Sequence, residues 1–355
     1  MPMPGSQRMD SIEAAYFLYS FRWIIRSLIC LMIAVSFIKV NWNRRWLPTL
    51  TLVVTFILIF LINSHLSADH MFLQTKHLTM ADAEHNKIEL SKLVIGVERN
   101  GFARAYPIEF IGYHHQVLDS INNEPIMVTY CTVCRTGRVY SPKVKGAYET
   151  FRLVGMDHFN AMFEDATTKS WWRQVNGEAV AGTLKGEHLS EVPSAQTSLA
   201  EWLKLYPNSL IMQPNDGEKK FYVSEDYETG KSKGSLTGTN HESWQDKSWV
   251  VGVVVNNSTK AYDWNQLVTK KIIMDQIDHT PVIIVVSSDQ KSFFAFEKKP
   301  GESFSVQNNS LVNDTFQYKL NGVAKGNYPS LKKIAAYQEF WHSWKTFHPQ
   351  TKIYK

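Results

Sequence analysis

The chain repeats part of its own sequence, and this repetition limits the folds that it can adopt. Leu93–Pro107 resembles Trp249–Asp263, at a constant offset that needs no gap through the strands that follow. The two stretches realign later at a shorter spacing, where Trp202–Pro207 matches Trp344–Pro349. Agreement over this length indicates two tandem copies of one structural unit.

Each copy has the same predicted pattern of strands and helices. Two apolar runs flank Asn100-Gly101, a favoured two-residue hairpin turn, and a short helix is expected near residues 108–118. Apolar residues at helical spacing predict a helix over Gln196–Tyr206, which Pro207 ends. We therefore expect an α+β, β-rich fold with two tandem pseudosymmetric β-rich units, preceded by two transmembrane helices.

Two apolar segments open the chain. Leu47–Asn63 has no charged residue and is almost long enough to span a membrane, whereas Phe17–Val40 carries Arg22 and Arg26 near its start. The loop Lys39–Trp46 between them has three positive charges, and after Asn63 the next Lys or Arg is Lys76. This asymmetry predicts a cytoplasmic loop, a two-pass anchor in the inner (cytoplasmic) membrane and a globular part facing the periplasm or outside. A cleaved signal peptide is the alternative, but the second segment begins too late and lacks a cleavage site.

The predicted domain boundaries follow from these segments. They are a membrane anchor (1–66), a juxtamembrane linker (67–92), a first repeat unit (93–207), a linker or lid (208–248) and a second, degenerate repeat unit (249–355). The part of the linker at 224–245 is rich in Ser, Thr, Gly, Glu and Lys, which is typical of a surface loop. The net charge of +5 is spread without a dense basic run, so nothing indicates a nucleic-acid partner.

A pair of cysteines, Cys131 and Cys134, lies between two predicted strands, so we expect it at a hairpin turn or strand end. The only other cysteine, Cys30, lies in the first apolar segment. At this spacing two thiols can close a disulfide or share a metal ion. The second copy has Ser287 and Gln290 at these positions but keeps the flanking strands. The fold itself therefore does not need the two thiols.

Other candidate residues lie near the cysteines or in a polar stretch of the first copy. His114 precedes the pair and is replaced by Lys270 in the second copy, and Arg135 follows it directly. His158 and Asn160 lie in Gly155–Asp165, for which we expect no counterpart in the second copy. This stretch is a candidate site or simply a polar loop.

The region around the cysteines resembles the DUF3179 family. The string Val-Thr-Tyr-Cys-x-x-Cys, an upstream His and a downstream Ser-Trp-Trp-x-Gln segment carry the resemblance, which covers Leu93–Pro207 and, more weakly, the second copy. Some relatives are described as selenoproteins, which implies redox chemistry at the cysteine position. The matching residues are His114, Thr129, Tyr130, Cys131, Cys134, Asn160, Trp171, Gln174, Gly177, Glu178, Trp202 and Pro207.

Three functions remain open from the sequence. The first is thiol–disulfide redox chemistry with an unknown protein or small-molecule partner, in which His114 and Arg135 would lower a thiol pKa. The second is binding of one copper or zinc ion by Cys131, Cys134, His114 and His158. The third is a membrane-anchored binding or scaffold module without a cofactor. There the cysteines would form a structural disulfide, and His158, Asn160, Trp171 and Gln174 are the candidate ligand-binding residues.

Overall fold

The structure is a computed structural model that describes residues 7, 9–39, 44, 46–75, 77–215, 217–222 and 238–355. The chain divides into two compact units. The smaller unit contains residues 1–73, 149–173 and 178–188, and the larger unit contains residues 74–148, 174–177 and 189–355. The predicted basic loop, apart from Lys39, Arg44 and Trp46, and residues 224–237 of the predicted lid lie outside the described residues.

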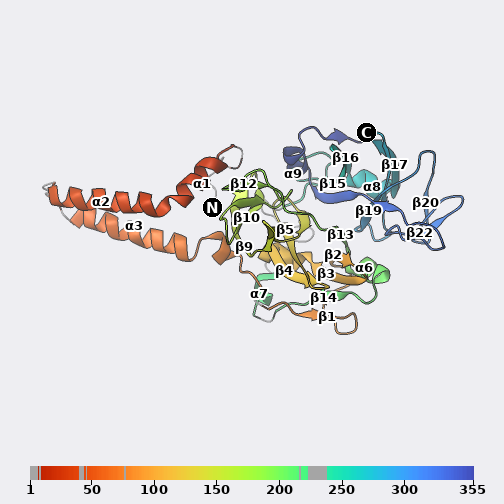
Figure 1. Cartoon of the computed structure of the whole chain (residues 1–355), viewed down its shortest axis with the longest axis horizontal. Helices are drawn as coiled ribbons and strands as arrows, with labels where there is room; N and C mark the ends of the chain where they lie inside the picture. Colours follow the sequence, from red (N-terminus) through yellow and green to blue (C-terminus); the bar gives the residue numbers. More distant parts are fainter. Residues whose placement is uncertain are drawn as a thin grey trace. The chain divides into compact units, whose positions relative to one another are not determined.

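The smaller unit combines the N-terminal helices with one antiparallel sheet. Helices α2 and α3 run side by side (Figure 1), and Arg26 of α2 donates a hydrogen bond to Asn63 of α3. The sheet has the strand order β12-β11-β10-β9. The elements are α1 (Ile12–Ser20), α2 (Arg22–Lys39), α3 (Trp46–Ser64), α4 (Ala68–Met71), β9 (Phe151–Asp157), β10 (Asn160–Asp165), β11 (Trp171–Arg173) and β12 (Ala179–Ala181).

The N-terminal helices agree in part with the predicted membrane segments. By length and composition, α3 can cross a membrane, and α1 and α2 pass the same test together although their axes are bent by 64°. These one or two apolar helices are compatible with a membrane anchor or with a signal sequence. Tyr16 and Tyr19 of α1 pack against Trp171 of the sheet in the same unit.

The first part of the larger unit follows the predicted pattern. Its first sheet has the order β1-β14-β3-β2-β13, and its second has the order β4-β5-β6. Asn100 and Gly101 both have positive φ, as the predicted turn between β2 and β3 requires. The elements are β1 (Met80–Ala81), β2 (Leu93–Arg99), β3 (Phe102–Pro107), α5 (Ile108–His114), β4 (Gln116–Ile121), β5 (Glu124–Cys131), β6 (Thr136–Tyr140), β7 (Lys143–Val144), β8 (Ala147–Tyr148), β13 (Ala195–Ser198), α6 (Leu199–Leu205), β14 (Leu210–Met212) and α7 (Lys219–Tyr222).

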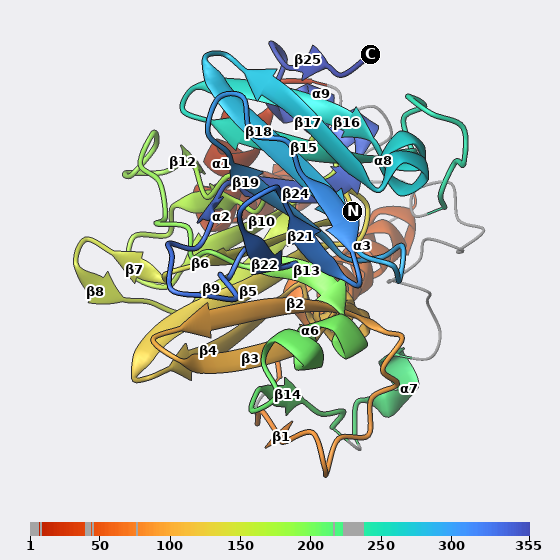
Figure 2. The same ribbon diagram turned by 90° about the vertical axis from the view of Figure 1, so that its right-hand side faces the viewer.

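The second part of the larger unit is also β-rich. Figure 2 shows β15 to β19 in light blue and β2 to β4 in orange and yellow. The strand orders are β24-β15-β16-β25, β17-β18-β19-β23 and β20-β21-β22. The elements are β15 (Trp249–Val255), β16 (Ser258–Asp263), α8 (Trp264–Lys270), β17 (Ile272–Ile277), β18 (Thr280–Val286), β19 (Phe293–Glu297), β20 (Ser305–Gln307), β21 (Ser310–Val312), β22 (Gln317–Lys319), β23 (Lys332–Lys333), β24 (Ala335–Phe340), α9 (Trp341–Phe347) and β25 (Lys352–Ile353).

One detail differs from the sequence-based expectations. Gln196–Ser198 is a strand rather than the start of a helix, because these residues pair with β2 before α6 begins at Leu199. The His158-Phe159 turn between β9 and β10 and the Asn308-Asn309 turn between β20 and β21 have positive φ at both of their residues. The mixed α+β, β-rich class with N-terminal helices is confirmed.

Candidate functional site

The two cysteines lie at the turn of a buried hairpin in the larger unit. Strand β5 ends at Cys131, which pairs with Thr136 at the start of β6. Residues 126–131 of β5 are buried, as the continuous apolar run predicts for a strand covered on both faces. Arg135 closes the turn with a φ of 57°, an uncommon conformation for a long side chain. The prediction that the pair lies at a hairpin turn is confirmed.

Both cysteines are free thiols with no exposed surface. Burial raises the pKa of the Cys134 thiol well above its usual value, and the hydrogen bond to Cys131 and the charge of Cys131 raise it further. Cys134 therefore keeps its proton more strongly than an exposed thiol does, which makes it a poor nucleophile until that proton is removed.

Residues from β24 and α9 cover the cysteine turn. The Phe340 backbone N–H donates to the Cys134 carbonyl oxygen at 2.9 Å, which fixes the junction between β24 and α9 against the turn. The Ser343 hydroxyl donates to Glu339 Oε2, and Arg138 Nη2 donates to Glu339 Oε1 at 3.0 Å. Glu339 and Ser343 have no exposed surface, and Arg138 is 2% exposed. The elements that cover the cysteine turn thus contain a buried ion pair, to which Ser343 is hydrogen-bonded.

A second basic group approaches the turn between the two cysteines. Lys247 Nζ donates to the Val133 carbonyl oxygen at 3.1 Å and lies 3.1 Å from His342 Nε2. Burial lowers the pKa of His342 to about 4, and the neighbouring Lys247 charge lowers it further. Burial also lowers the pKa of Lys247, whereas negative charge on Cys134 and Cys131 raises it. The Lys247 ammonium therefore contacts the backbone of the turn between the two cysteines.

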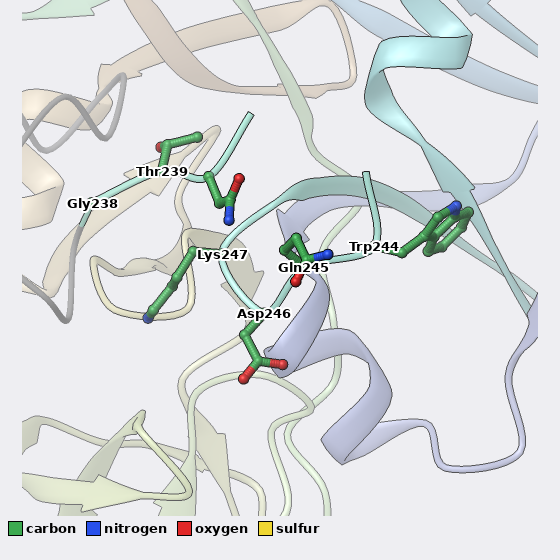
Figure 3. A pocket seen from close by; sticks show the side chains of 7 residues that line it. Gly238, Thr239, Trp244, Gln245, Asp246 and Lys247 are labelled. Atoms are coloured by element: carbon green, nitrogen blue, oxygen red, sulfur yellow. The ribbon is translucent and has the colours of Figure 1, made fainter. Parts of the chain in front are cut away.

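A cavity adjoins this lysine. Its volume is about 480 Å³, and it is lined by Gly238, Thr239, Asn240, Trp244, Gln245, Asp246 and Lys247. Figure 3 shows Lys247 and Trp244 extending to opposite sides of this segment. Lys247 thus lines this cavity and also contacts the backbone between the two cysteines.

Two further predicted residues lie close to the cysteine hairpin. Arg135 is buried, and its guanidinium carbon lies 6.0 Å from the centre of the Phe340 ring. Gln174 Nε2 donates to Thr129 Oγ1 at 3.0 Å and to the Thr136 carbonyl oxygen at 3.1 Å, so it braces β5 against β6. The structure therefore gathers Cys131, Cys134, Arg135 and Gln174 at one hairpin.

His114 is buried in contacts with elements other than the cysteine turn. Its Nε2 atom lies 2.8 Å from the Tyr222 hydroxyl, 2.9 Å from Thr75 Oγ1 and 3.5 Å from Glu218 Oε2. These contacts join α5 to α7, which lies in the predicted linker. A role of His114 at the thiols stays a prediction.

The remaining predicted residues belong to the smaller unit. His158 Nδ1 lies 2.5 Å from Asp157, and Trp171 Nε1 donates to Glu164 at 2.9 Å. Asn160 is buried and pairs with Asp157 across the β9–β10 turn. Within the described parts of the chain, no three His, Cys, Asp or Glu side chains form a group that could hold a metal ion. The metal and ligand-binding hypotheses thus stay predictions without supporting geometry.

Sequence reasoning did not identify the residues that surround the cysteine turn from the second part of the chain. These are Lys247, Glu339, His342 and Ser343. A signal was present, because matching Trp202 with Trp344 places Thr197 and Glu201 at the positions of Glu339 and Ser343. The two predicted copies therefore differ in sequence at Glu339 of β24 and Ser343 of α9 as well as at the cysteines.

Comparison with known proteins gives one match. The family model described as "Protein of unknown function (DUF3179)" matches residues 74–351, which is most of the chain and nearly all of the larger unit. No curated protein and no solved structure matches the chain. With the cysteine hairpin inside a match that covers most of the chain, the chain belongs to the DUF3179 family.

Proposed function

We propose that the chain is a membrane-anchored thiol–disulfide redox protein whose active group is the Cys131–Cys134 pair. The observation that carries this proposal is a pair of buried cysteines at one tight hairpin turn, not joined in a disulfide, with Lys247 Nζ donating to the Val133 carbonyl oxygen between them. Two thiols at the ends of one such turn can form a disulfide with a small movement of the turn. A nearby cation favours the thiolate, which is the reactive form.

The two cysteines take different roles in this proposal. Cys131 attacks a disulfide of the partner as a thiolate and forms a mixed disulfide, and one partner sulfur leaves as a thiol. Cys134 then attacks the Cys131 sulfur, closes the intramolecular disulfide and releases the second partner thiol. The pair loses two electrons, and the partner disulfide gains them. The raised pKa of Cys134 supports this assignment, because the resolving thiol keeps its proton until the second step.

We also infer that residues 93–207 and 249–355 are tandem copies, of which only the first carries the chemistry. In both parts a glycine lies against a tryptophan ring: a Cβ atom at Gly96 would lie 2.3 Å from Trp202, and one at Gly252 would lie 2.2 Å from Trp344. Tyr106 donates to Asp119 and Tyr262 donates to Asp275 at matching positions. The second copy forms β18 and β19 without cysteines, which supports a chemical rather than a structural role for the thiols.

The cavity beside Lys247 is the candidate route by which a redox partner reaches Cys131 and Cys134. Lys247 separates the cavity from Val133, so a movement of residues 238–247 would expose the turn between the sulfurs. We infer that the oxidised or reduced partner enters from this side. Its identity as a protein or a small molecule is left to experiment.

We propose a two-pass anchor with the N-terminus and the soluble part on the same side of the membrane. Tyr16 of α1 packs edge-on against Trp171 and donates to the Lys169 carbonyl oxygen, both within the smaller unit. A helix that touches the soluble sheet cannot lie across the membrane from it. The chain then crosses through α2 and returns through α3. The positive charges of Lys39, Arg44 and Arg45 favour a cytoplasmic loop and a periplasmic or external soluble part.

Labelling tests this topology. A cysteine placed at Asn43 in a Cys30→Ser background should react with a membrane-impermeant maleimide only after cell lysis, whereas one at the exposed Asp10 should react in intact cells whose outer layer is permeable. The opposite pattern would contradict the proposed orientation.

A redox titration of the full chain tests the proposed chemistry. The protein in detergent is equilibrated in glutathione or dithiothreitol buffers, and free thiols at Cys131 and Cys134 are counted by mass after alkylation. We expect both thiols to disappear together at one potential, and the Cys30→Ser variant to behave identically. Thiols that never oxidise within the range of these buffers would refute the redox function.

A further inference from the structure

Helix α1, which lies between α2 and β12 in Figure 1, has an apolar surface on the side that faces away from the sheet of the smaller unit. On the near side, Tyr16 and Tyr19 pack against Trp171, with ring centres 5.1 and 5.5 Å apart. Ile12 packs against the same group of buried residues and shares this face with the tyrosines, because residues three and four positions apart lie on one side of a helix. The opposite face, which we call the outer face of α1, carries Ala14, Phe17, Leu18 and, at the end of the helix, Phe21.

The outer face of α1 is exposed. Phe17 is 56% exposed, Leu18 is 58% exposed and Phe21 is 44% exposed. The rings of Phe17 and Phe21 contact each other one turn apart, with centres separated by 4.8 Å. Large apolar side chains that gather on one exposed face indicate a surface that another molecule covers.

We propose that the outer face of α1 lies in the headgroup region of the bilayer, with its apolar side chains at the boundary of the acyl chains. In this position α1 holds the β9–β12 sheet at the membrane surface. The inference rests on the proposed two-pass anchor and gives α1 a role that is separate from spanning the membrane. It does not depend on the chemistry of Cys131 and Cys134.

The apolar surface continues from α1 into α2 across the bend between them. Trp23 and Ile24 at the start of α2 are 65% and 59% exposed. Arg22, which lies at the bend, does not interrupt this surface. Its Nη1 atom donates to the Tyr19 carbonyl oxygen at 2.6 Å, and its guanidinium carbon lies 3.8 Å from the centre of the Tyr19 ring. The charge therefore lies beside a residue of the sheet-facing side, and the outer face stays uncharged up to α2.

The bend gives α1 the direction that this location requires. The axes of α1 and α2 differ by 64°. With α2 across the membrane, α1 therefore turns most of the way toward the plane of the bilayer. Trp23 lies directly after the bend, and tryptophan is enriched at the level of the headgroups. A helix in this plane buries one face in lipid and leaves the other face for the sheet.

Lipid fits the outer face better than a second copy of the chain does. The face offers only three large side chains, whereas a stable protein interface involves about 20–30 residues on each side. Helix α1 contains no Lys or Arg, so its contact with the membrane does not use the charge of anionic lipids. The proposed contact therefore needs only the apolar part of a neutral bilayer.

Depth measurements with spin labels test this location. The full chain is reconstituted in phosphatidylcholine vesicles in a Cys30→Ser background, and a nitroxide is attached to one introduced cysteine at a time. Oxygen, which concentrates in lipid, and a water-soluble nickel chelate report the depth of each label. The protein without an introduced cysteine is the blank, because Cys131 and Cys134 have no exposed surface. If the blank takes up label, the series is repeated with both of these cysteines replaced by serine.

Two matched pairs of positions separate the proposal from a helix that merely continues the span. Ala14→Cys and Phe17→Cys place the label on the outer face. Their controls, Ala15→Cys and Ser20→Cys, place it on the exposed flanks of α1 and nearer to α2 in the chain. In a continued span the positions nearer to α2 would be deeper. We expect the reverse, with a ratio of oxygen to nickel accessibility at least about twofold higher on the outer face than at the paired control.

A charge on the outer face should raise the helix out of the lipid. Leu18→Asp should lower the accessibility ratio of the label at Ala14 by about twofold or more, because an aspartate at the acyl-chain boundary keeps its water. Ser20→Asp, which adds the same charge on a flank, should leave that ratio unchanged. Both side chains are exposed, so both variants should keep the circular dichroism spectrum of the parent protein.

The outcomes separate the inference from the proposed anchor. Labels that are deeper on the flanks than on the outer face, or equally deep at all four positions, would overturn the inference and leave the two-pass anchor standing. Outer-face labels that neither oxygen nor the nickel chelate reaches, with spectra broadened by a second label nearby, would also overturn it, in favour of a second copy of the chain. Release of the chain from the vesicles by alkaline carbonate would overturn the proposed anchor itself.

Discussion

Replacement of Arg138 by methionine should destabilise the larger unit strongly, because it leaves Glu339 charged and buried. The Arg138 guanidinium lies 3.0 Å from Glu339 Oε1, donates to the Gly137 carbonyl oxygen at 2.9 Å and lies 3.4 Å from the centre of the Tyr337 ring. Unit charges at this separation attract by about 5 kcal/mol at an effective dielectric constant of about 20. Most of that attraction offsets the cost of burying both charges.

The size of the effect follows from this balance. The single Arg138→Met change should lower the free energy of unfolding by about 3–5 kcal/mol, whereas the double change with Glu339→Met should lower it by about 1–2 kcal/mol.

The assay is denaturant unfolding of the full chain in mild detergent, followed by tryptophan fluorescence. The double-mutant cycle gives the coupling energy between the two side chains, with Lys345→Met as a control that removes an exposed ion pair with Asp246. The control should change stability by less than about 0.5 kcal/mol. A loss below about 1 kcal/mol in Arg138→Met, or additive single changes, would refute the buried ion pair.

Three further outcomes are expected. The double change Cys131→Ser, Cys134→Ser should keep the circular dichroism spectrum and lose less than about 3 kcal/mol of stability, because the matching turn of the second copy forms with Ser287; a failure to fold would assign the thiols a structural role. Gly252→Ala should lower the free energy of unfolding by at least about 1–3 kcal/mol in the same assay, because the new Cβ atom would overlap the Trp344 ring. An unchanged free energy of unfolding would contradict that packing. Because the pKa of His342 is about 4, below its ordinary value of about 6.5, stability should fall as the pH drops between these values. In the His342→Gln variant, the decrease in the free energy of unfolding from pH 7 to pH 4.5 should be smaller by about 2 kcal/mol. The same decrease in both proteins would show that His342 does not contribute to it.

The local structure around the cysteines could be predicted because it depends on neighbours in the sequence. Asn100-Gly101 supplies the positive φ angles of a tight turn, and the apolar run before Cys131 supplies a buried strand. The start of α6 was placed too early, because the helical spacing of Leu199 and Trp202 continues back into residues that pair with β2. Pairing between distant strands overrides a local preference and leaves no mark on the periodicity.

The sequence by itself determined the hairpins and the place of Cys131 and Cys134 at a turn. It also predicted two copies, of which only the first has cysteines at this turn. Only the tertiary structure brought Glu339, which lies 201 positions from Arg138, and Ser343 to that turn. Periodicity indicates which face of a helix or strand is buried but not which element covers it. Which residue pairs with a buried charge depends on how distant segments of the chain pack together. An unpaired charge has a large free-energy cost only where it is shielded from water, and the local sequence does not specify where that is.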